Sequence, residues 1–78
     1  MAREDQPQPA LGKAIRELRE KRGTTQEALA YEAGLTTGTL SLIERGLSNP
    51  SWGTVKAVAK SLNVSMAELA KLAAKREG

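Results

Sequence analysis

A glycine in the middle of a helical pattern constrains this chain more than any other feature. In the stretch TQEALAYEAGLTTGTLSLIERG, residues 25–46, apolar residues recur at helical spacing on both sides of Gly34. Small polar residues, TTGT, follow that glycine closely before the apolar spacing resumes. Glycine adopts a positive φ readily, so it can end one helix and turn the chain directly into the next. The stretch therefore predicts two short helices joined by a tight turn.

The same signals divide the rest of the chain. Capping residues, glycines and apolar stripes predict helices at residues 11–22, 25–33, 37–45, 52–62 and 66–76. No stretch alternates with period two, so no strand is expected. The predicted fold is an all-α, compact five-helix bundle at residues 10–76, preceded by a disordered lead-in at residues 1–9, which is polar and net negative.

Local motifs set the expected helix ends. Thr24 with Glu27, and Ser65 with Glu68, have the spacing of capping boxes. Asn63 is expected to end the fourth helix in the left-handed conformation.

Composition limits the kinds of site. The 78 residues include no cysteine and no histidine, which argues against a disulfide, a zinc site or any cofactor that needs such ligands. Asp5 is the only aspartate, so no catalytic constellation is visible and no enzymatic activity is expected. No apolar run approaches the roughly 20 residues of a membrane span, and no signal peptide is visible, so a cytoplasmic location is expected. A net charge of +3 is compatible with a polyanionic partner.

The predicted helix at 37–45 has two unlike sides. At about 100° per residue, Leu40, Ile43 and the following Leu47 fall on one side, which we expect to face the core. The opposite side is small or polar and ends in an arginine: Thr37, Gly38, Ser41, Leu42 and Arg45. A helix whose first turn enters a DNA major groove needs small side chains there, so this side is predicted to contact DNA.

The spacing around Gly34 matches two helices that cross steeply. Ala30 is small where the two backbones approach, and Gly34 supplies the turn. With the segments TQEALA, GLTTGTLSLIERG, NPSWGTV and LNVSMAEL, the chain resembles the Cro/repressor-type helix-turn-helix family, also called the xenobiotic-response-element (XRE) family, over about residues 11–72. The resemblance implies a five-helix domain that binds DNA through its third helix, commonly as a homodimer on a two-fold symmetric operator.

The resemblance also implies residue roles. A glutamine at the position of Gln26 contacts phosphate and braces the recognition helix. Arg45 at the end of the recognition helix, and Ser48 and Asn49 in the loop after it, should also reach phosphates. The base-reading positions hold Thr37, Gly38 and Leu42 in place of the longer amides of phage repressors. Weak direct readout is therefore predicted, with Leu42 contacting a thymine methyl. The predicted DNA-contacting residues are Gln26, Thr36, Thr37, Gly38, Thr39, Ser41, Leu42, Arg45, Ser48 and Asn49.

Three other residues receive structural roles. Arg19 and Glu44 resemble the family's internal salt bridge. Trp52 has two interpretations at this stage: an anchor of the dimer, or a lid over the small core.

The predicted function is a sequence-specific, DNA-binding transcription regulator of repressor or controller type, acting as a homodimer on palindromic double-stranded operator DNA. The alternative is an antitoxin or coactivator-like adaptor whose main partner is a protein.

Overall fold

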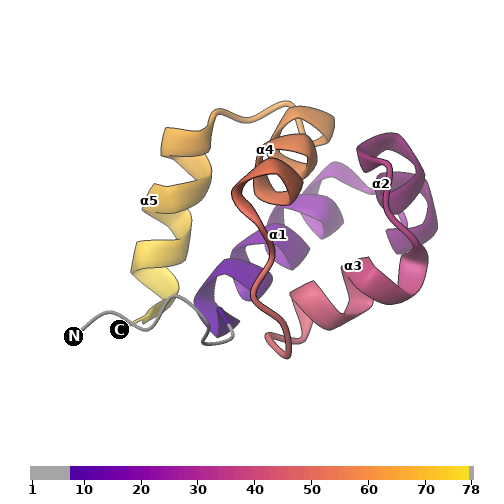
Figure 1. The fold of residues 1–78 in the computed structure, drawn as a ribbon. Coiled ribbons are helices and arrows are strands. Elements are labelled where there is room, and N and C mark those ends of the chain that lie inside the picture. The colour runs from indigo at the N-terminus through magenta and orange to yellow at the C-terminus, as the bar shows by residue number, and fades with distance from the viewer. Residues whose placement is uncertain (1–7, 78) are drawn as a thin grey trace.

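The computed structural model describes residues 8–77, and this range folds into five α-helices (Figure 1). They are α1 (Pro9–Arg22), α2 (Gln26–Ala33), α3 (Thr37–Glu44), α4 (Trp52–Ser61) and α5 (Met66–Glu77). The all-α prediction is confirmed, with each helix within two residues of its expected ends. Residues 1–7 of the predicted lead-in lie outside the described residues. No helix among residues 8–77 is long and apolar enough to cross a membrane.

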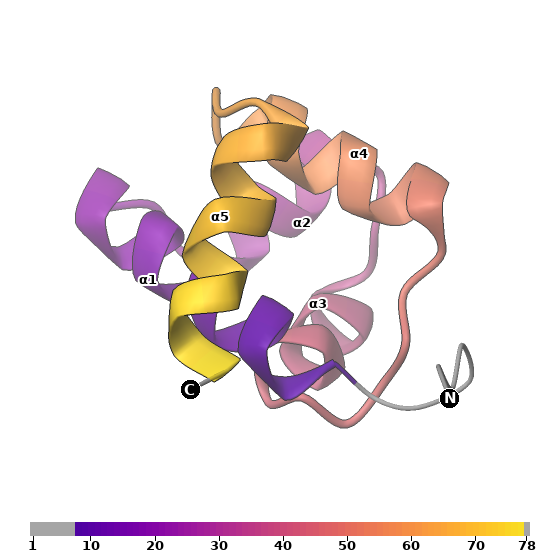
Figure 2. The same cartoon turned by 90° about the vertical axis from the view of Figure 1, so that its left-hand side faces the viewer.

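Helix α1 is the centre of the arrangement. It packs against α5 on one side and α3 on the other, while α2 packs against both α3 and α4 (Figures 1 and 2). All five helices contribute aliphatic side chains to one core: Ala14, Ile15, Leu29, Ala30, Leu40, Ile43, Val55, Val58, Ala59, Leu62 and Leu69. The two aromatic residues stay outside it.

Local capping residues determine where the helices start. Two of the predicted starts need correction. The predicted capping box at Thr24 and Glu27 is wrong, because the next threonine, Thr25, caps α2 and accepts a hydrogen bond from the N–H of Ala28 at 3.0 Å. Helix α1 begins at Pro9, inside the predicted lead-in, since proline suits the first turn of a helix. The Ser65–Glu68 box is confirmed by reciprocal hydrogen bonds of 2.8 and 3.0 Å.

Residues in the left-handed conformation end several of the helices. Gly34 has φ 74° and ends α2, and Asn63 has φ 59° after α4, as predicted. Gly46 has φ 73° and ends the turn after α3.

The expected core position of Leu47 is wrong. Its side chain is 59% exposed, because the positive φ of Gly46 interrupts the helical rotation on which the prediction rested. The N–H of Leu47 instead bonds back to the carbonyl of Leu42 at 2.9 Å.

Gly12 lets α1 approach the C-terminal end of α3. A β-carbon at this buried position would overlap the carbonyl oxygen of Ile43 and lie 2.9 Å from that of Glu44. The backbone contact therefore fixes the position of α3 against α1.

Candidate nucleic-acid interface

The outward side of α3 is open to solvent. Thr37, Gly38 and Thr39 are exposed, Leu42 is 42% exposed, and Ser41 is half-buried. Nothing lies within ordinary contact distance of a β-carbon built on Gly38, apart from the hydroxyl of Thr36 at 4.0 Å. The first turn of α3 thus presents a low, accessible surface.

Thr36 holds that first turn together. Its hydroxyl oxygen accepts a hydrogen bond from the N–H of Thr39 at 3.0 Å, and the two hydroxyls lie 2.8 Å apart. Both threonines were predicted as DNA contacts, and in this structure their hydroxyls are bonded to each other.

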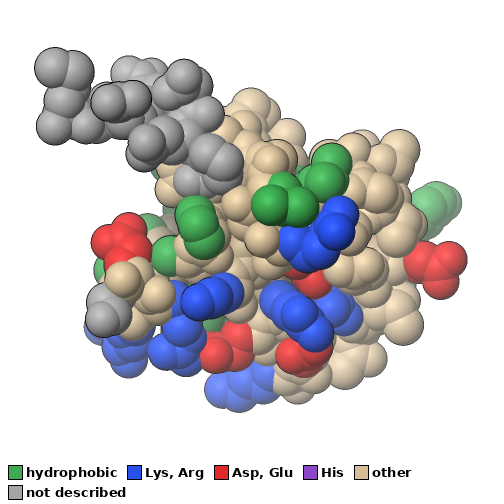
Figure 3. Space-filling model, turned by 90° about the horizontal axis from the view of Figure 1, so that it is seen from below, with side chains coloured by type: hydrophobic (Ala, Val, Ile, Leu, Met, Phe, Trp, Pro, Cys, Tyr) green, Lys and Arg blue, Asp and Glu red, His purple; other side chains and the backbone are tan. Residues whose placement is uncertain are grey.

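The side of the molecule that carries α3 is rich in positive charge. Figure 3 views the face below Figure 1, where α3 runs along the lower edge, and Lys and Arg side chains gather there with acidic ones between them. Arg45 is exposed at the end of α3. On α1, Lys13 and Arg16 follow the Gly12 contact and are exposed, although Arg16 is paired with Glu20 at 3.1 Å.

A buried polar network stands behind α3. The Arg19 guanidinium donates to Glu44 through Nε at 2.7 Å and Nη2 at 3.1 Å, and these side chains are only 13% and 2% exposed. The amide of Gln26 donates to the same carboxylate at 2.9 Å, and Arg19 also donates to the carbonyl of Thr24 at 2.9 Å. The hydrogen bond to Glu44 raises the pKa of Arg19 above its ordinary value despite burial. The network joins α1, α2 and α3 through charge-assisted hydrogen bonds, which are stronger than neutral ones.

Gln26 therefore acts as a brace in this structure. Its side chain is committed to Glu44 at the start of α2, while its predicted phosphate contact stays a prediction. The family resemblance implied the pair Arg19–Glu44 but did not imply that Gln26 would share its carboxylate.

The loop after α3 limits how Ser48 and Asn49 could make the predicted main-chain and side-chain phosphate contacts. The hydroxyl oxygen of Ser48 is buried and has no hydrogen-bond partner among the described residues, and its carbonyl accepts from the N–H of Gln8 at 3.3 Å. A phosphate contact from Ser48 would have to come from its main chain. Asn49 is exposed, as a phosphate contact requires.

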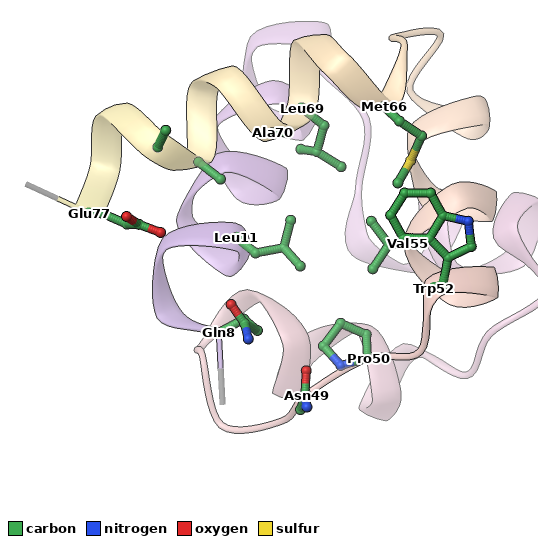
Figure 4. A pocket seen from close by; sticks show the side chains of 12 residues that line it. Gln8, Leu11, Asn49, Pro50, Trp52, Val55, Met66, Leu69, Ala70 and Glu77 are labelled. Carbon is green, nitrogen blue, oxygen red and sulfur yellow. The ribbon is translucent and has the colours of Figure 1, made fainter. Parts of the chain in front are cut away.

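An apolar groove lies on a different side, between α1, α4 and α5. It has a volume of about 360 Å³ and is lined by aliphatic side chains that include Leu11, Val55, Met66 and Leu69 (Figure 4). Trp52 lies at its edge and is 71% exposed, so the lid interpretation of this residue is wrong.

Comparison with known proteins identifies the fold and its relatives. A family model described as helix-turn-helix matches residues 15–69. The HTH-type transcriptional regulator SlrR of Bacillus subtilis is 40% identical over 60 residues, which cover 76% of this chain but only 40% of SlrR. The match thus spans less than half the length of that relative.

Solved structures match over a larger share. The clp gene regulator ClgR from Corynebacterium glutamicum superposes with a TM-score of 0.88 at 32% identity, covering 91% of each chain. The restriction-modification controller protein C.Esp1396I, solved as a tetramer in complex with its natural 35 base-pair operator, gives a TM-score of 0.80 at 29% identity, covering 87% of this chain and 90% of that one. This chain belongs to the helix-turn-helix family.

Proposed function

We propose that this helix-turn-helix protein is a transcription regulator that binds operator DNA as a dimer, with α3 in the major groove. The observation that carries the proposal is the contrast across α3: an exposed side of small residues, and an opposite side fixed by the core and by the buried Glu44. A recognition helix needs both properties, because its atoms must be accessible to base edges and held in one position.

Individual roles follow from the exposed positions. Thr37, Gly38 and Leu42 face the bases, whereas Arg45 and Asn49 contact phosphates on one side of α3. The Gln26 amide already donates to Glu44, so its main role is to hold α2 against α3.

The dimer contact is assigned to Trp52 and the apolar groove beside it. An exposed tryptophan at the edge of an apolar groove has the character of an interface anchor. The oligomeric state of C.Esp1396I on its operator supports a symmetric assembly, and a dimer predicts a palindromic site. Since the proposed partner is operator DNA, we expect the protein to act at the nucleoid, as a DNA-binding regulator of a non-enzymatic kind.

The second candidate is an adaptor or antitoxin that binds another protein. The apolar groove favours it, because the same surface could accept a segment of a partner instead of a second copy. In that case DNA binding would be weak and indifferent to sequence.

Selection from random duplex DNA, followed by affinity measurements over a series of salt concentrations, tests the proposal. We expect an enriched palindrome whose affinity falls steeply with salt. Recovery of no sequence above background, with the folded protein confirmed in the same sample, would reject the proposal and favour the adaptor.

A further inference from the structure

Two exposed leucines lie at the C-terminal end of α3. Leu42 is 42% exposed and Leu47 is 59% exposed. The N–H of Leu47 donates to the carbonyl of Leu42 at 2.9 Å, and the N–H of Gly46 donates to that of Ile43 at 3.0 Å. This pair of bonds is the Schellman ending of a helix, in which the two outer side chains commonly touch. This geometry places the two leucines side by side at the helix end, and they are here called the leucine pair.

The leucine pair lies on the outward side of α3. At about 100° per residue, Leu42 is rotated by only about 40° from Gly38 and about 60° from Arg45. Figure 3 likewise shows hydrophobic side chains beside Lys and Arg side chains on this face. The leucine pair is continuous with the surface proposed to enter the groove.

The bend that exposes Leu47 is fixed in place. A β-carbon on Gly46 would lie 2.7 Å from the Cα of Pro9, so the start of α1 closes off the space behind the loop. The main chain of Gln8 also holds the carbonyl of Ser48 at 3.3 Å. Leu47 is thus held outward between two anchored neighbours.

With Arg45 assigned to a phosphate, apolar contact is the strongest form of base discrimination that the rest of this surface offers. Thr37, Gly38 and Ser41 carry no side chain that can make two parallel hydrogen bonds to a base. On the major-groove edge of a base pair, the apolar group is the C5 methyl of thymine. 5-Methylcytosine carries a methyl at the same ring carbon, so an apolar contact recognises both bases.

We propose that the leucine pair detects pyrimidine C5 methyl groups, that Leu47 extends the reading surface beyond α3, and that operator binding responds to cytosine methylation. This inference rests on the proposed function.

The test compares duplexes that differ only by that methyl. In the selected operator, each thymine is replaced by deoxyuridine and each cytosine by 5-methylcytosine, one position at a time. We expect the methylated member of each pair to bind about fourfold more tightly at the contacted positions, the affinity change that one buried methyl group produces.

Variants of Leu47 test whether its side chain produces the methyl preference. Leu47→Ala should abolish the methyl preference at one position in each half-site, and Leu47→Met, which keeps an apolar side chain, should retain it. A methyl preference that is unchanged in Leu47→Ala, or a wild-type scan with no methyl-dependent position, would overturn the inference. Both outcomes leave the proposed function intact, provided that binding stays salt-dependent and selective; a loss of selective binding to every duplex would instead reject the function itself.

Discussion

The two ends of this small domain are built in different ways. Around α3, backbone contact at Gly12 and a buried ion pair fix three helices against one another. Around α5, the polar contacts are exposed: the Glu17–Arg76 pair, at 2.7 Å, has side chains 43% and 38% exposed, and the neighbouring groove is open. A surface that must match DNA atom by atom needs the first construction, whereas a surface that packs against another protein tolerates the second.

The largest expected effect separates the two ion pairs. Glu44→Ala leaves a buried guanidinium and the Gln26 amide without their acceptor and should lower the free energy of unfolding by roughly 3–5 kcal/mol. Glu17→Ala, which breaks the exposed pair, should lower it by less than about 1 kcal/mol. Chemical denaturation measures both.

A double-mutant cycle completes that test. Replacing Arg19 and Glu44 together should cost less than the two single changes summed, because neither charge is then left alone. Additive costs, or equal costs for the buried and exposed pairs, would contradict the contrast.

Trp52→Ala should affect association and leave the fold intact. Because the side chain is 71% exposed, little core packing is lost. If Trp52 anchors the interface, its removal should weaken the dimer by about 2 kcal/mol, which raises the dissociation constant roughly thirtyfold. Tyr31→Ala removes a still more exposed aromatic, 86% accessible, and serves as the control. Sedimentation equilibrium that detects the same dimer in both variants would remove Trp52 from the interface.

Glycine substitutions probe the backbone contact. Gly12→Ala should destabilise by about 1–3 kcal/mol, because α1 and α3 must separate to admit the methyl group. Gly53→Ala in α4 faces open space, with only the Ser51 hydroxyl at 4.0 Å, and should stabilise by about 0.5–1 kcal/mol through helix propensity. Thermal unfolding of the two variants should therefore shift in opposite directions, and a stable Gly12→Ala protein would mean that the contact is not tight.

The smallest effect concerns the exposed cap of α5. Hydrogen bonds from the main chain and hydroxyl of Ser65 lower the pKa of Glu68. The carboxylate form therefore stabilises the fold above the ordinary carboxyl pKa, and this contribution is lost as the pH falls through the lowered value. Glu68→Gln keeps the shape without the charge, so its stability difference from wild type should change between about pH 5 and 3. Parallel stability curves for both proteins would show that the cap does not depend on charge.

Most of the fold could be predicted from the sequence because the capping and turn signals that set the helix ends are local. Gly34, Asn63 and the Ser65 box act through neighbouring residues, and each is where the pattern placed it. The predictions that were wrong or missing depend on a local competition, on one backbone dihedral angle or on contacts between residues distant in sequence. Leu47 is exposed because the positive φ of Gly46 ends the regular helical rotation that placed it on the core side. The cap of α2 was misplaced because Thr24 and Thr25 are adjacent and identical, and Thr25 takes the capping position. The close contact at Gly12, and the sharing of Glu44 by Gln26, involve partners that are distant in sequence.

The central claim is that the exposed side of α3 faces DNA, and Arg45 tests it most directly. The measurement is the salt dependence of affinity for the selected operator, for wild type, Arg45→Ala and the control Lys60→Ala, which removes an exposed charge from α4. Loss of one phosphate contact should weaken binding to all sequences alike and reduce the slope of log affinity against log salt by about one unit in Arg45→Ala. Lys60→Ala should keep the wild-type slope. If Arg45→Ala retains the wild-type affinity and slope while the protein still binds its operator, α3 does not present this side to the DNA.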